Sequence, residues 1–191
     1  MARAMTLRAT TLAALAATML ALAACSGEDS PGEAAEVSDE TLASLVSSAD
    51  GLSVVSKSLG DAGLAQVFDG AAAYTLFAPQ DAAFEALGEA GEDLRTVEQR
   101  PAMVAILRDH IVPGYLTPDD IARAIELAED GSVEMRSMGG HMLTFTSEGD
   151  TITVANEGGA SAKFTGEALR ASNGVAIPLD GLLKTTAPPQ G

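Results

Sequence analysis

The hydrophobic pattern of the chain changes its period near Gly131, and this change limits the folds that the chain can adopt. Before Gly131, apolar residues recur at helical spacing, as Leu42, Leu45 and Val46 do at positions i, i+3 and i+4. After Gly131, apolar and polar residues alternate, which is the pattern of half-buried strands. Helices followed by strands predict an α+β fold with a mainly antiparallel sheet.

The first half of the chain predicts several short helices, because glycine repeatedly interrupts the helical pattern. Ser38 is a candidate N-cap of the first helix. Clearer helices are expected over residues 101–112, opened by a proline, and over residues 117–128, with Thr117 as N-cap. The glycines that end the earlier stripes are Gly51, Gly60 and Gly70.

The second half predicts short strands joined by tight turns. A hairpin is expected across residues 147–150, between apolar pairs at Leu143 and Phe145 and at Ile152 and Val154. Asn173-Gly174 is a strong turn signal. The remaining strands are expected around residues 133–135, 163–165 and 175–183.

Residues 74–84, YTLFAPQDAAF, switch abruptly from strand chemistry to helix chemistry. Pro79 ends the strand pattern that begins at Tyr74, because proline donates no backbone hydrogen bond to a sheet. Asp81 then falls in the first turn of a helix, where its negative charge meets the positive end of the helix dipole. The segment is therefore expected to form a rigid corner that leads from a strand into a helix.

The first 25 residues have the pattern of an export signal. Two arginines precede residues 11–24, an uncharged stretch rich in Ala and Leu that is too short to span a membrane. Residues 22–25, LAAC, resemble a bacterial lipobox. The sequence therefore predicts a lipoprotein signal peptide over residues 1–24 and acyl chains such as palmitate on Cys25. An ordinary secretory signal that contains a cysteine is the alternative.

Cys25 is the only cysteine of the chain, so no intrachain disulfide can form and the fold depends on its core. Acylation gives this lone cysteine of an exported chain a role. Two or more acyl chains suffice for stable anchoring. We therefore expect lipid anchoring to a bacterial membrane of the cell envelope, with the domain facing the periplasm or the exterior. Ser26 favours the outer membrane where the host has two membranes.

Residues 25–37 are expected to be the lipidated cysteine and a disordered tether. The segment is rich in Gly, Ser, Glu and Asp and shows no apolar period. Its r.m.s. span would be roughly 20 Å, which lifts the domain off the membrane. The domain is then expected over residues 38–186, followed by a short disordered tail over residues 187–191.

The charge of the chain limits its partners. The formal net charge is −16 at pH 7, and removal of a signal peptide with two arginines and no acids takes it to −18. Nucleic-acid binding depends on a basic face, so we expect no nucleic-acid partner. The same charge argues against docking of the domain on anionic lipid, which leaves the acyl chains on Cys25 as the expected membrane contact.

Three segments together resemble the signatures of fasciclin domains. Residues 74–84 resemble the first signature, a T-hydrophobe-FAP-x-D-x-AF pattern. Residues 107–116, LRDHIVPGYL, resemble the second, in which a helix ends in H-x-V-P-G, and residues 172–183, SNGVAIPLDGLL, resemble the last strand. The segments occur in the family's order and at its spacing. The resemblance covers about residues 37–186.

This resemblance implies a single fasciclin-like domain, a wedge-shaped antiparallel β-sandwich with several short helices. It also implies that the signature residues serve architecture. In the family pattern His110 is an inward, hydrogen-bonded residue, and its position on one stripe with Ile106 agrees with a buried role. The signature residues of this chain are Thr75, Phe77, Pro79, Asp81, Phe84, His110, Pro113, Gly114, Asn173, Gly174 and Asp180.

The chain departs from the animal adhesive members of the family at positions linked to integrin binding. Asp109 stands where those members have a tyrosine, and Ala168 and Leu169 stand where they have an Asp-Ile pair. The sequence contains no Arg-Gly-Asp. Integrin binding is therefore not carried over. Ile177 stands where many members place a histidine, so the contribution of that histidine is absent.

No sequence pattern indicates catalysis. The chain has two histidines and lacks the G-x-S-x-G, H-E-x-x-H, P-loop and G-x-G-x-x-G motifs. His141 is expected on a solvent-facing loop. The acids around Asp119 lack the spacing of a calcium loop, and the methionines between residues 135 and 142 are expected to pack in the core and not to bind copper. We expect no enzyme activity, no catalytic residue, no cofactor and no metal.

Two functions from different classes remain open at this point. The first is a non-catalytic, lipid-anchored module of the cell envelope for cell adhesion or for binding a matrix component or another partner, a protein or glycan of the cell surface. The alternative is a small-ligand protein that holds a lipid or glycan between helices and sheet, or an envelope accessory protein. A partner retained in a pull-down favours the first, and a small molecule that co-purifies favours the second.

Overall fold

The structure is a computed structural model that describes residues 37–183. The predicted signal peptide, Cys25, all but the last residue of the predicted tether, and the predicted tail lie outside the described residues. Within them, no helix is both long enough and apolar enough to cross a membrane.

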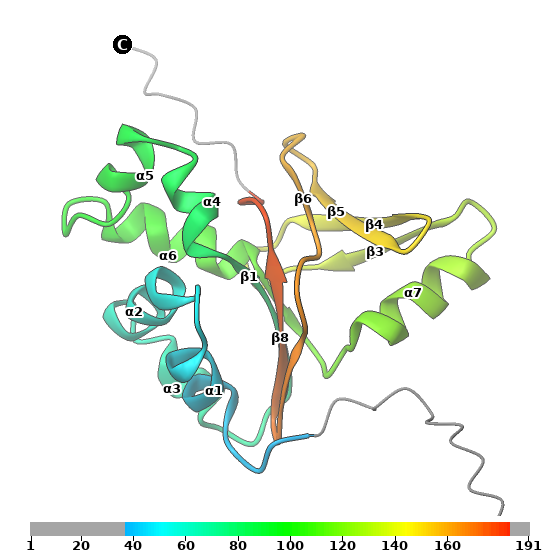
Figure 1. Ribbon diagram of the computed structural model, residues 1–191, viewed down its shortest axis with the longest axis horizontal. Helices are drawn as coiled ribbons and strands as arrows, with labels where there is room; N and C mark the ends of the chain where they lie inside the picture. Colours follow the sequence, from blue (N-terminus) through cyan, green and yellow to red (C-terminus); the bar gives the residue numbers. More distant parts are fainter. Residues whose placement is uncertain (1–36, 184–191) are drawn as a thin grey trace, which may run out of the picture. The chain divides into compact units, whose positions relative to one another are not determined.

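Short helices dominate the first half of the described residues, as the sequence predicts (Figure 1). The helix that begins after Thr41 has Thr41 and not Ser38 as its N-cap, because the Thr41 hydroxyl accepts a hydrogen bond from the Ser44 backbone N–H at 3.3 Å. The helices are α1 (Leu42–Ser48), α2 (Ser53–Asp61), α3 (Ala65–Phe68), α4 (Asp81–Glu85), α5 (Glu89–Asp93), α6 (Arg100–Asp109) and α7 (Pro118–Leu127).

The strands form two four-stranded sheets, which confirms the predicted α+β class. The first sheet has the order β2 (Ile111–Pro113), β1 (Tyr74–Pro79), β8 (Gly174–Leu179) and β7 (Leu169–Ala171). The second has the order β3 (Ser132–Arg136), β4 (Met142–Glu148), β5 (Thr151–Asn156) and β6 (Ser161–Lys163).

One strand pair differs from the antiparallel expectation. Strands β1 and β8 are parallel neighbours, from Tyr74 beside Gly174 to Pro79 beside Leu179, whereas the other pairs of named strands are antiparallel. Turn signals in the sequence determine direction only for strands joined by a short loop. Strands β1 and β8 lie far apart in the chain, so no local signal could show that they pair in parallel.

The two predicted tight turns have different outcomes. The hairpin across residues 147–150 is confirmed, because Glu148 faces Thr151 and Gly149 has a φ of +59°. In the turn at Asn173-Gly174, Ala171 faces Gly174, so Ser172 and Asn173 form the loop and Gly174 begins strand β8. The glycine is therefore needed for close packing and not for turn geometry.

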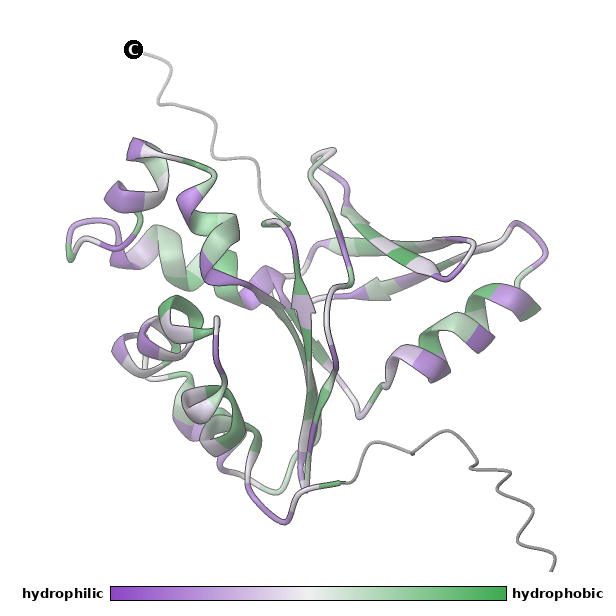
Figure 2. Cartoon of the chain, viewed as in Figure 1, coloured by the Kyte–Doolittle hydropathy of each residue, from purple (hydrophilic) through white to green (hydrophobic). Residues whose placement is uncertain are grey.

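The first sheet is covered on both faces, which explains the continuous apolar runs of β1 and β8. Leu76 and Ala78 pack into a core shared with α1, α2, α4 and α6, while Phe77 packs into a second core shared with α7, β4 and β5. In the second core the Phe77 ring lies 5.1 Å from the Phe145 ring. Figure 2 shows hydrophobic stretches on α4, α6, β1 and β4, separated by hydrophilic turns.

Candidate functional site

The corner between β1 and α4 holds the N-terminus of another helix, α2. The Asp81 carboxylate accepts hydrogen bonds from the Ser53 backbone N–H at 3.2 Å, the Ser53 hydroxyl at 2.7 Å and the Val54 backbone N–H at 2.8 Å. In the other direction, the Asp81 backbone N–H donates to the carbonyl of Gly51. Asp81 therefore supplies the cap that α2 lacks, because Leu52 at its N-cap position has no suitable side chain.

These hydrogen bonds favour the charged form of Asp81. Partial burial acts to raise the pKa of its carboxyl. The hydrogen bonds from the Ser53 hydroxyl and from the backbone of Val54 and Ser53 outweigh burial and lower the pKa below its usual 3.8. Asp81 is therefore charged at neutral pH, as a carboxylate facing a helix N-terminus should be.

Thr75 joins β1 to the segment that follows β2. Its buried hydroxyl donates to the Gly114 carbonyl at 2.9 Å and accepts from the Leu116 backbone N–H at 2.9 Å. Gly114 has a φ of +117°, a region that side-chain-bearing residues rarely adopt. Pro113, which faces Tyr74, is exposed at the end of β2. These residues shape the exit from β2.

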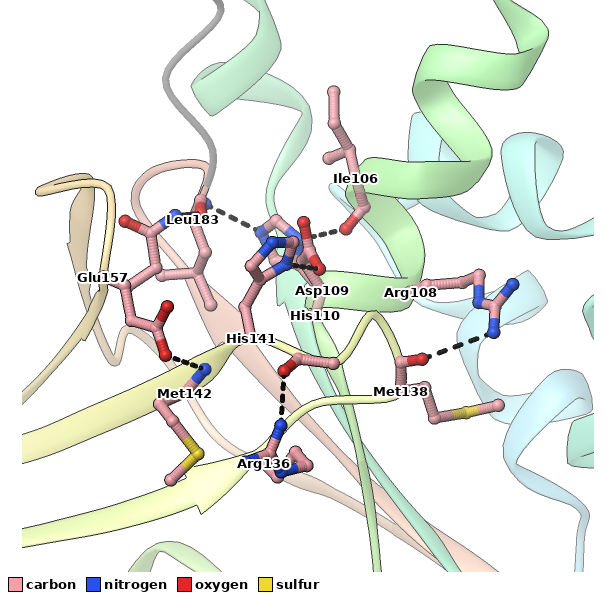
Figure 3. A network of polar contacts seen from close by, with 12 residues as sticks. Ile106, Arg108, Asp109, His110, Arg136, Met138, His141, Met142, Glu157 and Leu183 are labelled. Atoms are coloured by element: carbon pink, nitrogen blue, oxygen red, sulfur yellow. Dashed lines mark hydrogen bonds and ion pairs between the residues drawn. The ribbon is translucent and has the colours of Figure 1, made fainter.

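His110 is fully buried at the C-terminal end of α6 and is hydrogen-bonded through both ring nitrogens (Figure 3). Its Nδ1–H donates to the Ile106 carbonyl at 2.8 Å, because a carbonyl can only accept. Its Nε2 accepts from the Leu183 backbone N–H at 3.0 Å. The imidazole thus ties α6 to the segment after β8.

Burial lowers the pKa of His110 from 6.5 to about 4, although the hydrogen bond to Ile106 and the negative charge of Asp109 both act to raise it. The ring is therefore neutral at physiological pH. Since both nitrogens already have backbone partners, His110 is not placed to transfer a proton to or from a bound molecule.

The segment around Asn173 ties the first and last parts of the domain together. The Asn173 amide oxygen accepts from the Leu42 backbone N–H at 2.8 Å, at the start of α1, and its NH₂ donates to the carbonyls of Phe68 and Gly70. At Gly174, an added Cβ would lie 2.4 Å from the Tyr74 carbonyl oxygen and 2.8 Å from a methyl carbon of Leu42. Asn173 therefore links α1 to α3, and glycine allows β8 to lie close to β1.

The other signature residues lie elsewhere in the fold and do not converge on one site. Asp180 is exposed, and its carboxylate accepts from the Lys163 backbone N–H at 2.7 Å. Pro79 ends β1 beside Leu179. Phe84 is buried in the core next to the helices, whereas Phe77 belongs to the other core. The signature residues are thus distributed over both cores and over connections in different parts of the fold.

One polar pair near His110 had no signal in the sequence. His141 is about half-exposed, and its Nδ1–H donates to the buried Asp109 carboxylate at 2.7 Å, across 32 residues of sequence (Figure 3). Gly139 packs against the same carboxylate, because an added Cβ there would lie 1.8 Å from an Asp109 oxygen. The loop between β3 and β4 is held on α6 by this pair and by the Gly139 backbone N–H, which donates to the Arg108 carbonyl.

Two surface hollows lie along α6. The first, of about 130 Å³, is lined by residues of α2, of α6 and of the segment before α6, including Lys57, Arg95 and Arg100. The second, of about 340 Å³, is lined by Pro101, Ala105, Arg108, Asp109 and His141, among others. Val104 lines both hollows, so they lie next to each other on one face of α6.

Comparison with known proteins identifies the family. The profile of the Fasciclin domain matches residues 50–185, which is more than two thirds of the chain. The chain belongs to the fasciclin domain family. No curated protein sequence matches it.

A solved structure supports the fasciclin fold. A FAS1 domain pair from the insect cell adhesion molecule Fasciclin I matches with a TM-score of 0.66 at 16% sequence identity. The match covers 76% of this chain and 51% of that one, so the chain spans about half the length of the insect domain pair. At this identity the likeness establishes the fold and nothing more.

The positions at which this chain departs from the animal adhesive members of the family are buried or partly buried in the domain. Asp109 is buried in the pair with His141, and Ile177 is buried in the core between the sheets. Ala168 and Leu169 are partly buried beside the two cores. The departures are therefore accommodated by packing and by one polar pair.

The fasciclin domain gathers no metal ligands in the part of the chain that the structure describes, since no group of three His, Cys, Asp or Glu side chains is positioned to hold an ion. Asp119 is paired with Arg170 at 3.2 Å, and Asp120 caps α7. The carboxylates of Asp119 and Asp120 therefore both have partners within the domain.

Proposed function

We propose that this chain is a non-catalytic binding module, anchored at the cell envelope by acyl chains on Cys25 and used for cell adhesion or for binding a matrix component or another surface partner. The proposal rests on the observation that the polar signature groups form hydrogen bonds within the fold. Thr75, Asp81, His110, Asn173 and Asp180 all have internal hydrogen-bond partners. Recognition is therefore left to the outer surface, where rigid folds usually carry binding.

The family supports this assignment. The FAS1 domain pair that matches this fold comes from a cell adhesion molecule, and a single domain displayed on an anchor suits the same kind of role. The space between the helices and the first sheet is filled by buried apolar side chains. A partner would thus bind on the outside of the domain and not between helices and sheet.

The anchoring half of the proposal rests on the LAAC sequence at residues 22–25 and on the acidic, glycine-containing segment that follows. Metabolic labelling with palmitate tests it. Cys25→Ser should abolish the label and release the protein from the membrane fraction, whereas Ser26→Ala, at the neighbouring position, should keep both. A label that persists in Cys25→Ser, or a wild-type protein found unmodified in solution, contradicts lipid anchoring.

The adhesion half is tested on intact cells. Cells that lack the protein should attach or aggregate less than cells that produce it, and cells that produce Cys25→Ser should resemble those that lack it. Crosslinking on intact cells, followed by mass spectrometry, should recover a surface partner. Unchanged attachment across several surfaces, together with no crosslinked partner, contradicts the proposed function.

A further inference from the structure

The face of α6 carries an unusual concentration of positive charge for this acidic domain. Eight of the eleven Lys and Arg residues fall within residues 37–183. Four of these eight, Lys57, Arg95, Arg100 and Arg108, line the two adjoining hollows. The acids of these linings are Asp61 and Asp109. Asp61 lies 2.5 Å from Lys57, and Asp109 lies 2.7 Å from His141. The four cations and two acids of the linings leave a formal excess of two positive charges.

Apolar surface separates these arginines. Pro101 and Ala105 are exposed on α6, and Val104 is partly exposed between them. Arg100 and Arg108 lie eight positions apart, which is about 12 Å along a helix. Val97, 69% exposed, lines the first hollow beside Arg100. We call the alternating surface formed by Arg95, Arg100, Pro101, Val104, Ala105 and Arg108 the α6 strip.

We propose that the α6 strip binds an acidic polysaccharide, a chain whose sugars carry carboxylate or sulfate groups. This inference rests on the proposed function and names the class of its surface partner. Guanidinium groups bind carboxylate and sulfate oxygens with charge-assisted hydrogen bonds. The Pro, Val and Ala side chains between them give the carbon-hydrogen faces of sugar rings an apolar surface to rest on.

The charge of the domain favours a thin chain over a broad surface. A formal net charge of −16 repels an anionic lipid plane, which would approach many acids at once. A single polysaccharide chain in the strip is close to the arginines, while acids more than about 10 Å away are screened at physiological salt. Charge complementarity is therefore local, and a narrow polymer fits it.

The geometry also argues against an acidic peptide as the partner. Peptides are commonly bound by addition to an exposed strand edge or as a helix in an apolar groove. The α6 strip belongs to a helix and to the loop before it, so it has no strand edge. The linings of its two hollows include charged side chains, and their largest apolar side chains, Leu94 and Met103, are buried and offer no broad apolar groove.

Calorimetric titration of the full chain tests the proposal. Every sample carries Cys25→Ser, so that acyl chains cannot insert into vesicles. The probe is an oligosaccharide of galacturonic acid, and the matched neutral probe is an oligosaccharide of galactose. We expect the acidic probe to bind, the neutral one not to bind, and the affinity to fall at least about tenfold between about 0.05 M and about 0.5 M NaCl.

Charge-matched variants assign the binding to the strip. Arg95→Ser with Arg100→Ser should weaken binding about tenfold, which corresponds to the loss of two exposed charge pairs. Arg123→Ser with Lys163→Ser removes the same charge from exposed positions on α7 and β6 and should leave binding within about twofold. A third variant, Arg108→Ser, also removes a 3.4 Å hydrogen bond to the Met138 carbonyl, so its melting temperature is measured as well.

Several results would overturn the inference. Equal losses in the two double variants would show that only net charge matters. Tighter binding of phosphatidylglycerol vesicles or of polyglutamate would assign the strip to a membrane or to an acidic protein. If the oligosaccharide binds through the strip but cell attachment does not depend on the protein, the inference stands and the adhesion proposal fails. If cell attachment requires the protein but is unaffected by Arg95→Ser with Arg100→Ser, the adhesion proposal stands and the inference about the α6 strip fails.

Discussion

Helices α2 and α7 both begin at a carboxylate, but the two carboxylates come from different parts of the chain. In α7, Thr117 and Asp120 cap each other within one turn, with the Thr117 hydroxyl 3.1 Å from the Asp120 backbone nitrogen and the Asp120 carboxylate 2.9 Å from the Thr117 backbone nitrogen. In α2, the carboxylate is Asp81, which lies 28 residues from Ser53. A local cap stabilises one helix, whereas a distant cap also fixes two elements against each other.

The same contrast separates the two sheets. The first sheet and its helices are joined by side chains that reach far along the sequence, namely Asp81, His110 and Asn173. The second sheet is a series of neighbouring strands from β3 to β6, each paired with the next in the chain. Loss of a distant contact should therefore destabilise the whole domain, while loss of a local one should mainly loosen its own element.

Replacement of His110 should have the largest effect. His110→Ala removes a buried ring and leaves the Leu183 N–H and the Ile106 carbonyl without this partner, so we expect a loss of about 4 kcal/mol in the free energy of unfolding. Urea unfolding measures this loss. His110→Gln, which can restore one hydrogen bond, should lose less. An unchanged unfolding midpoint in His110→Ala, with loss of an activity, would show that the residue serves chemistry and not architecture.

A fall in pH should destabilise the domain through His110 without any mutation. The pKa of His110 is depressed from 6.5 to about 4 in the folded protein, chiefly by burial. Its contribution is therefore complete above pH 6.5 and is lost as the pH falls towards 4. The largest expected loss is about 3 kcal/mol, since one pKa unit corresponds to about 1.4 kcal/mol. Urea unfolding at pH 7 and near pH 4.5 measures it.

Two variants test whether this pH dependence comes from His110. His110→Gln should abolish the loss between pH 6.5 and 4, whereas His141→Gln should keep it. The carboxyl groups of Asp81 and Asp120 have pKa values below 3.8, so protonation of these caps affects stability only at lower pH. A wild-type stability that is flat across this range would contradict a buried, neutral His110.

Removal of the distant cap of α2 should have an intermediate effect. Asp81→Ala leaves the Ser53 and Val54 N–H groups without their carboxylate, and we expect a loss of about 2 kcal/mol, the upper end for N-caps. Asp81→Asn, which keeps an acceptor oxygen, should lose less. Hydrogen exchange should speed up at Val54 and also at the corner between β1 and α4. Faster exchange confined to α2 would contradict the coupling of the two elements.

The sequence predicts the local features of this fold well and the distant ones poorly. The hairpin at residues 147–150 and the cap at Thr117 are recognisable because their partners lie a few residues apart. The sequence predicts Ser38 as the first cap, whereas the structure has Thr41 there, because both positions precede the same apolar stripe and only packing distinguishes them.

Contacts between distant segments have no comparable signal. Asp81 lies in the first turn of α4, as the sequence predicts, but its carboxylate caps α2, whose position relative to the corner depends on the whole fold. The pairing of Asp109 with His141 and the parallel arrangement of β1 and β8 likewise depend on the whole fold. The family resemblance points to Asp81 as a signature residue, but it does not show which helix the carboxylate caps.

The smallest effect is expected at the local cap of α7, where it can be compared directly with the distant cap of α2. Asp120→Ala removes one half of the Thr117–Asp120 box, and we expect a loss of about 1 kcal/mol, which is typical of a single cap. Hydrogen exchange should speed up in the first turn of α7 and nowhere in the first sheet. Because the two sites share no partner, the losses of Asp81→Ala and Asp120→Ala should add to within about 0.5 kcal/mol in the double variant. If Asp120→Ala lost as much stability as Asp81→Ala, distance along the chain would not determine what a cap contributes, and the two helix starts would be equivalent after all.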